Sequence, residues 1–439
     1  MVFLCFYISD MSEIQLCLKQ KRALLLIVKG GLMTATNQAQ PKMKLSEIFT
    51  KNLIIFMIVH FLSDCSNNMI TAFINMGAKA AGISAAAIGL AASTYSIAAL
   101  LMRMPAGNMT TTQKKRLLVI GVIVFRYLTS FLLGTLGMSS STMFIIFRTI
   151  NGLGWSIAGV VIPAIEATLL DKRAMGTTYA VYTALSAFAK GMVRSLGVSV
   201  YQSSGIVTAT IAAGGFALAA ILLVNFMNWN DEKLQRIKPR GNKKGLFSGV
   251  NKNYMGVCFL MGCAVVTWTL NQQFNNVLAQ ERGIDIATIL AITAVISSVW
   301  GFAASALCDF IKPKYVLVFT YLVLGIGTII LGKAETYNMF LIGEILCTIG
   351  TGYSKIQTLY LYKACAPEER PSVHATSFFV TDIFSLVAGA MVGLFIEKLG
   401  YTNAYMVSSV FVLVAAVMIF IGGDKMMAKG QVESETAEA

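Results

Sequence analysis

The chain has 439 residues, of which 56% are hydrophobic and 13% are charged, about half the charged share of an ordinary soluble domain. A soluble fold of this length cannot bury so much apolar surface, so the composition excludes a soluble globular protein and predicts a polytopic membrane protein. The formal net charge of +14 would suit nucleic acid, and the position of the charges decides that question below.

The residues that bind metals or form disulfides are sparse. The two histidines, His60 and His374, lie far apart in the sequence, and the eight cysteines contain no C-x-x-C pair. This pattern argues against a zinc site and a disulfide framework. We therefore expect no metal, no cofactor and no enzymatic centre.

Residues 1–42 form an N-terminal extension that differs from the rest of the chain. Residues 1–32 contain one weakly apolar stretch and no small-residue cleavage pattern, so no signal peptide is predicted. Lys29-Gly30-Gly31 reads as a translated bacterial ribosome-binding sequence, and Met33 follows it closely. We expect residues 1–32 to be an artefact of start-site choice in a bacterial protein.

Apolar windows of about 20 residues, the length that spans a bilayer as a helix, follow along the chain. Six lie in the N-terminal half, residues 43–227, at 52–77, 85–106, 117–136, 141–168, 179–201 and 205–227. A polar, basic loop, 228–253, precedes six more in the C-terminal half, residues 254–422, at 254–278, 286–308, 315–332, 337–362, 374–396 and 402–422. Residues 423–439 form a charged tail. The predicted fold is an all-α membrane protein with twelve transmembrane helices in two halves of six.

Lysine and arginine are concentrated in alternate loops, among them the central loop 228–253 and the segment Lys114–Arg116. The intervening loops hold only Lys79, Arg282, Lys333 and Lys398. By the positive-inside rule, the basic loops and both termini are cytosolic. The net charge is thereby explained by the membrane, and we do not expect nucleic acid as a partner.

The two halves are related in sequence. Gly152–Ser156 (GLGWS) in the first half aligns with Gly350–Ser354 (GTGYS) in the second. Because six is an even number of spans, both halves have the same direction across the membrane. Such parallel repeats are typical of carriers in which a solute site lies between halves that expose it alternately to each side.

Three local patterns carry a family resemblance. The fourth window contains Arg148-Thr149-Ile150-Asn151-Gly152-Leu153-Gly154, which resembles the R-x-x-x-G-x-G motif of helix four in the major facilitator superfamily. The loop from Gly107 to Arg116 resembles the family's G-x-L-x-D-R-x-G-R-K loop, with Thr111 at the acidic position. The equivalent loop of the second half keeps the acid as Asp309. The resemblance covers residues 43–422 and implies the major facilitator fold. Its motif residues here are Gly107, Asn151, Gly152, Gly154 and Asp309.

Asp64 lies near the middle of the first window, where a charge costs about 2.5–3.5 kcal/mol to insert and usually faces a partner or a watery cavity. It resembles the helix-one acid that pairs with a helix-four arginine in proton-coupled sugar carriers of the family, which here would be Arg148. The resemblance implies that Asp64 and Arg148 couple proton movement to transport. A static buried ion pair is the alternative. His60, one turn before Asp64, is a possible further member of this network. For Arg126, in the third window, we expect a structural role.

Lys190 and Arg194 lie four residues apart in the fifth window and so share one helix face, where they repel each other unless an anion binds. They are predicted to bind a carboxylate or phosphate of the substrate, the alternative being an ion pair with a neighbouring acid such as Asp382. Glu344, in the tenth window, is a further buried acid. Asn271 and Gln272 are predicted either to face the solute cavity or to cap the seventh helix at the membrane surface.

The sequence therefore predicts a secondary active transporter that works by alternating access and is driven by protons. We expect a monomeric, multi-pass protein of the cytoplasmic (plasma) membrane that moves a small organic solute, preferably an anion or a carboxylate. Alternatives are a drug or metabolite efflux carrier of the same superfamily, a non-transporting membrane sensor and a membrane-embedded enzyme. No G-x-x-x-x-G-K-[ST] loop is present, which argues against an ATP motor within the chain.

Overall fold

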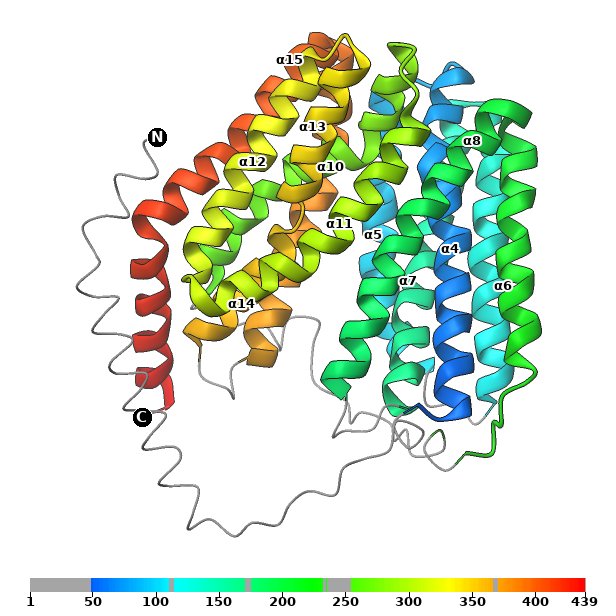
Figure 1. Cartoon of the computed structure of the whole chain (residues 1–439), viewed down its shortest axis with the longest axis horizontal. Helices are drawn as coiled ribbons and strands as arrows, with labels where there is room; N and C mark the ends of the chain where they lie inside the picture. Colours follow the sequence, from blue (N-terminus) through cyan, green and yellow to red (C-terminus); the bar gives the residue numbers. More distant parts are fainter. Residues whose placement is uncertain are drawn as a thin grey trace. The chain divides into compact units, whose positions relative to one another are not determined.

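The computed structural model describes residues 49–109, 114–169, 175–231, 234, 254–365 and 370–438, and the regular structure of these residues is helical. The N-terminal half contains α4 (Lys51–Ala80), α5 (Ala85–Met109), α6 (Lys115–Gly134), the 3-10 helix η1 (Leu136–Ser139), α7 (Ser141–Leu169) and α8 (Met175–Val224). The C-terminal half contains α10 (Met255–Glu281), α11 (Ile286–Phe310), α12 (Pro313–Lys333), α13 (Tyr337–Gly350), α14 (Tyr353–Ala364) and α15 (Arg370–Glu438) (Figure 1).

Two of these helices are too long for a single membrane crossing, and each is interrupted by a glycine. Gly205 in α8 and Gly400 in α15 have φ angles of 80° and 75°, in the left-handed region that glycine adopts without steric cost. Gly205 is the first residue of the predicted window 205–227, and Gly400 lies between the predicted windows 374–396 and 402–422. Among the described residues, eight helical segments are long and apolar enough to cross a membrane. The count of twelve crossings and the cytosolic position of the termini stay predictions.

The predicted window 337–362 is divided in the structure. Helix α13 ends at Gly350 and α14 begins at Tyr353, and the break falls within the repeated motif Gly350–Ser354. Thr351 N still donates to Cys347 O at 2.8 Å, and Gly352 N donates to Ile349 O at 3.2 Å. The aligned motif in the first half, Gly152–Ser156, lies inside the unbroken helix α7.

The two halves pack closely where α5 meets α15. A Cβ atom added to Gly89 would lie 2.3 Å from the carbonyl oxygen of Gly389, and one added to Gly393 would lie 2.5 Å from that of Ala85. Only small residues permit this approach of two helix backbones. The G-x-x-x-G spacing of Gly389 and Gly393 thus serves helix packing.

Polar contacts join the halves near the α4–α5 and α10–α11 loops and near the interruption of α15 at Gly400. Lys79 Nζ lies 2.9 Å from Glu281 Oε1. Asn75 Nδ2 donates to Gln273 Oε1 at 2.7 Å, and Ala86 N donates to Glu397 Oε2 at 3.0 Å. These contacts close the halves on the side that the charge pattern predicts to be external.

Candidate functional site

A cavity of about 270 Å³ lies between the two halves. The N-terminal half contributes residues of α4 and α8 to its wall, and the C-terminal half contributes residues of α10, α11 and α13. Thr351, at the break between α13 and α14, also lines it. The cavity therefore occupies the position between repeats at which the sequence predicts a solute site.

Five of the six predicted substrate-binding residues meet at this cavity. Lys190 and Arg194 of α8 line one side, and Asn271 and Gln272 of α10 and Glu344 of α13 line the other. The sixth, Asp382, is half-buried on α15 and is not among the described lining residues. The shared location is a structural fact, and the roles of these residues in binding stay predictions.

Arg194 presents a buried positive charge to the cavity. Its Nε atom is buried and has no hydrogen-bond partner among the described residues. Glu344 is the acid that attracts it electrostatically, but no ion pair within 4.0 Å joins the two in the described part of the chain. A buried guanidinium normally satisfies its donors. The site thus has an unused capacity to bind an acceptor.

Glu344 is held in a fixed orientation by its neighbours. Asn275 Nδ2 donates to Glu344 Oε1 at 2.8 Å, and Tyr405 OH donates to Asn275 Oδ1 at 2.7 Å. These two hydrogen bonds fix the orientation of the Asn275 amide. The carboxylate of Glu344 therefore keeps its place near Arg194.

The rest of the cavity wall is made of amides, hydroxyls and small apolar side chains. Asn68, Asn276, Thr293 and Ser297 line it, and none of the described lining residues is aromatic. Asn271 donates from Nδ2 to Thr328 Oγ1 at 3.0 Å, whereas its Oδ1 atom is buried without a described partner. Such a wall recognises polar groups by hydrogen bonds, and it offers no ring on which a substrate could stack.

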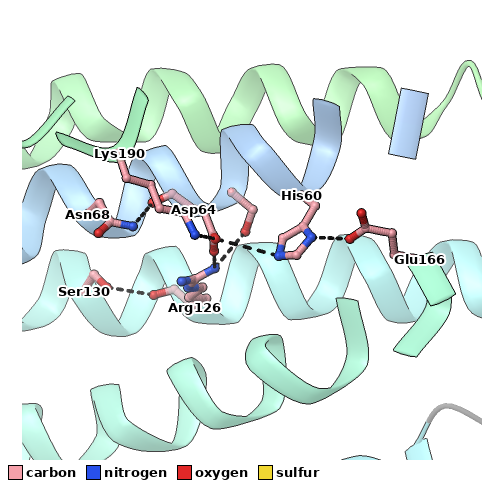
Figure 2. Close-up of polar contacts among 8 residues, drawn as sticks. His60, Asp64, Asn68, Arg126, Ser130, Glu166 and Lys190 are labelled. Atoms are coloured by element: carbon pink, nitrogen blue, oxygen red, sulfur yellow. Dashed lines mark hydrogen bonds and ion pairs between the residues drawn. The ribbon is translucent and has the colours of Figure 1, made fainter. Parts of the chain in front are cut away.

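A charged cluster surrounds Asp64 beside the cavity (Figure 2). Asp64 Oδ1 lies 3.0 Å from Arg126 Nη1, and Asp64 Oδ2 lies 2.5 Å from Lys190 Nζ. Arg126 Nη1 also donates to Ser63 Oγ at 3.2 Å. Since Lys190 lines the cavity as well, its ammonium connects the solute site to the buried acid.

The predicted pairing of Asp64 with Arg148 is wrong in this structure. Arg148 lies over the ring of Tyr95, with Cζ 4.8 Å from the ring centroid, and its Nη1 donates to Asn151 Oδ1 at 3.5 Å. The cause is the register of α7: His60, one turn from Asp64, contacts Glu166, and Arg148 lies about 27 Å from Glu166 along that helix.

The residues that do contact Asp64 were visible in the sequence as intramembrane charges. Arg126, for which a structural role is expected, is a direct ion-pair partner of Asp64. His60 and Glu166 were not predicted to meet, yet Nδ1 of His60 and Oε2 of Glu166 are in close contact. No spacing along the chain identifies this pair, because it depends on the packing of α4 against α7.

The motif residues of α7 pack helices together. A Cβ atom added to Gly152 would lie 2.5 Å from the Tyr95 carbonyl oxygen, and one added to Gly154 would lie 2.7 Å from Thr129 Oγ1. Asn151 Nδ2 donates to Ser130 Oγ at 2.8 Å. Gly107 and Asp309, the predicted conformational residues of the two loops, lie outside the residues whose surroundings the structure describes.

Several solved structures of transporters share this fold. The structure resembles a point-substituted form of the nucleoside transporter NupG, with a TM-score of 0.71 and 12% identity over 84% of this chain and 99% of that one. It resembles the D-xylose-proton symporter, with a TM-score of 0.65 and 14% identity over 84% and 96%. It also resembles a POT family transporter in complex with a thioalcohol-conjugated peptide, with a TM-score of 0.64 and 12% identity over 85% and 96%.

Sequence comparison gives the family directly. No curated protein matches this chain in sequence at a significant level. The family profile described as Major Facilitator Superfamily matches residues 56–362, which is more than half of the chain and includes α7 with its motif. The chain belongs to the major facilitator superfamily.

Proposed function

We propose that this protein is a secondary active transporter that carries a small organic anion across the cytoplasmic membrane by alternating access, coupled to protons. The observation that carries the proposal is the buried guanidinium of Arg194, which faces a cavity between the halves with Nε unsatisfied among the described residues. A carboxylate would accept charge-assisted hydrogen bonds from it, which are about twice as strong as neutral ones.

Lys190 supports both the anionic substrate and the coupling to protons. Its ammonium lies 2.5 Å from Asp64 Oδ2 and also lines the cavity. An anion that enters the cavity therefore competes with Asp64 for the same cation. Binding of substrate weakens the hold of Lys190 on Asp64, so the charge of the buried cluster depends on whether the cavity is occupied.

The structural relatives are consistent with this activity in general terms. Their names specify a nucleoside transporter, a D-xylose-proton symporter and a POT family transporter in complex with a conjugated peptide. At 12–14% identity the likeness concerns the fold alone. The anionic preference proposed here rests on Lys190 and Arg194.

Transport assays on purified protein in liposomes test the proposal. With an inward proton gradient, uptake of labelled lactate, succinate and D-glucuronate is compared with uptake of the neutral analogues lactamide and D-glucose. We expect at least one carboxylate to accumulate and the neutral analogues to be excluded. Arg194→Gln should raise KM for that carboxylate by about ten-fold or more, because a hydrogen bond to a charged group contributes about 1.5–3 kcal/mol.

The control is Lys314→Gln, which removes a cation bound to Asp424 at 2.7 Å, a pair that does not line the cavity. It should leave KM unchanged. Uptake of the neutral analogues in preference to the carboxylates, or an unchanged KM in Arg194→Gln, would contradict the anion site.

A further inference from the structure

His60 lies between two acids, and each of its ring nitrogens faces a carboxylate oxygen (Figure 2). Nδ1 contacts Oε2 of Glu166, and Nε2 lies 3.7 Å from Oδ2 of Asp64. Glu166 is almost fully buried, and His60 and Asp64 are each 14% exposed. The three side chains therefore interact in surroundings that screen charge weakly.

This arrangement favours one proton more than the neutral imidazole carries. A neutral histidine donates from one ring nitrogen and has a lone pair on the other. With both carboxylates ionised, that lone pair would point at a negative oxygen and repel it. An imidazolium ion, or a protonated Glu166, replaces this repulsion with an electrostatic attraction.

Asp64 is not the group that needs this proton. Its two oxygens already receive the ion pairs from Arg126 and Lys190, which compensate its negative charge. Within the described cluster, Glu166 has no contact of this kind with a lysine or arginine, and its partner is His60.

We propose that His60 and Glu166 together form the proton-binding site of this carrier. The inference rests on the proposed function and deepens it, since it locates the coupled proton on this pair and makes Asp64 the connection to the substrate. Among the described residues, the charged groups in contact within this cluster are Asp64 on α4, Glu166 on α7, Arg126 on α6 and Lys190 on α8. The thiol of Cys65 follows Asp64 in the chain and is buried.

The geometry sets the direction of coupling. A proton on His60 adds a third positive charge beside Asp64, so Asp64 holds Lys190 less strongly and Lys190 becomes available to an anion in the cavity. When the proton leaves, Asp64 recovers Lys190 and the anion is weakened. Proton and anion therefore bind cooperatively, and by linkage each raises the affinity for the other by the same factor. This is the behaviour of a symporter.

Nuclear magnetic resonance of the imidazole nitrogens tests the site without any substrate. The chain contains two histidines, so protein labelled with ¹⁵N-histidine gives two sets of ring signals, and His374→Gln assigns the set of His60. We expect the His60 ring of the His374→Gln protein to show two protonated nitrogens at neutral pH, or one nitrogen in a strong hydrogen bond to a protonated Glu166. Glu166→Gln should convert the ring to the ordinary neutral pattern. A His60 ring that is neutral in the unaltered site and unaffected by Glu166→Gln would overturn the proposal.

Transport provides the second measurement. For whichever of lactate, succinate and D-glucuronate is carried, the apparent affinity of the unaltered protein should rise at least about five-fold between about pH 8 and about pH 6. His60→Gln should reduce that change to less than about two-fold, and His374→Gln should preserve it. If none of the three probes is transported, the proposed function fails while the resonance experiment still decides the proton site. If transport is pH-dependent and His60→Gln keeps that dependence, the proton site fails while the proposed function stands.

Discussion

The ammonium of Lys190 lies 2.5 Å from Asp64 Oδ2 and also lines the cavity between the halves. One side chain thus belongs to both the solute site and the buried charged cluster. The interaction is local and electrostatic, so no long-range pathway has to be assumed between substrate and proton.

Neutralising Asp64 tests this connection. Asp64→Asn removes the acid that competes with the substrate for Lys190, and it leaves both Lys190 and Arg126 without their partner. We expect gradient-driven accumulation of the carboxylate to be lost, because proton binding no longer changes the availability of Lys190, whereas exchange of labelled for unlabelled substrate continues. Proteoliposome uptake and counterflow, measured on the same preparation, distinguish the two. Accumulation that still responds to pH would show that Asp64 does not connect the sites.

The ion pair between Lys79 and Glu281 should act on the opening of the predicted external side. Both side chains are about one-third exposed, so the pair contributes about 0–1 kcal/mol. Lys79→Glu should therefore slow uptake by only a few-fold, and the swapped double variant Lys79→Glu with Glu281→Lys should restore it, because the attraction is regained. The double-mutant cycle is measured as initial uptake rates. A double variant no faster than Lys79→Glu would mean that the two residues do not act as a pair.

The close approach of α5 and α15 should be intolerant of a single methyl group at Gly89. A Cβ atom there would lie 2.3 Å from a backbone oxygen, which cannot move away as a flexible side chain could. Gly89→Ala should lower the thermal stability of the purified protein. It should also slow the movement of the two halves that exposes the cavity to the other side of the membrane. Gly121→Ala is the matched control, since a Cβ atom at Gly121 meets nothing within 4 Å. Melting temperatures of both variants decide the point, and equal values would exclude tight packing at Gly89.

Reporter fusions test the predicted topology. A reporter after Lys244, in the basic central loop, should be cytosolic, and one inserted in the segment 202–205 should be external. Gly205, at the end of that segment, separates the two parts of α8, which places the insertion at a turn. Alkaline phosphatase activity marks an external position, and green fluorescent protein fluorescence marks a cytosolic one. The reverse distribution would invert the orientation inferred from lysine and arginine.

The helical segments could be predicted from the sequence because lipid imposes a length of about 20 apolar residues on each one. Five cavity residues could also be predicted, because charged and amide side chains in such segments seldom face lipid. The partners of Asp64 could not be predicted, because they depend on how far α6 and α7 are displaced along α4. A difference of five turns separates Arg148 from Glu166 on the same helix, and periodicity alone does not reveal that register.

The break between α13 and α14 was not predicted either, because the interval 337–362 has about the length of one membrane-spanning helix and the aligned stretch of α7 is continuous. It makes the two halves structurally unequal at the repeated motif. In the N-terminal half α7 continues through the motif, whereas in the C-terminal half one helix ends and another begins, and Thr351 between them lines the cavity. The cavity wall therefore includes an interruption of helical structure on the C-terminal side, whereas Asp64, Arg126 and Glu166 lie on the continuous helices α4, α6 and α7.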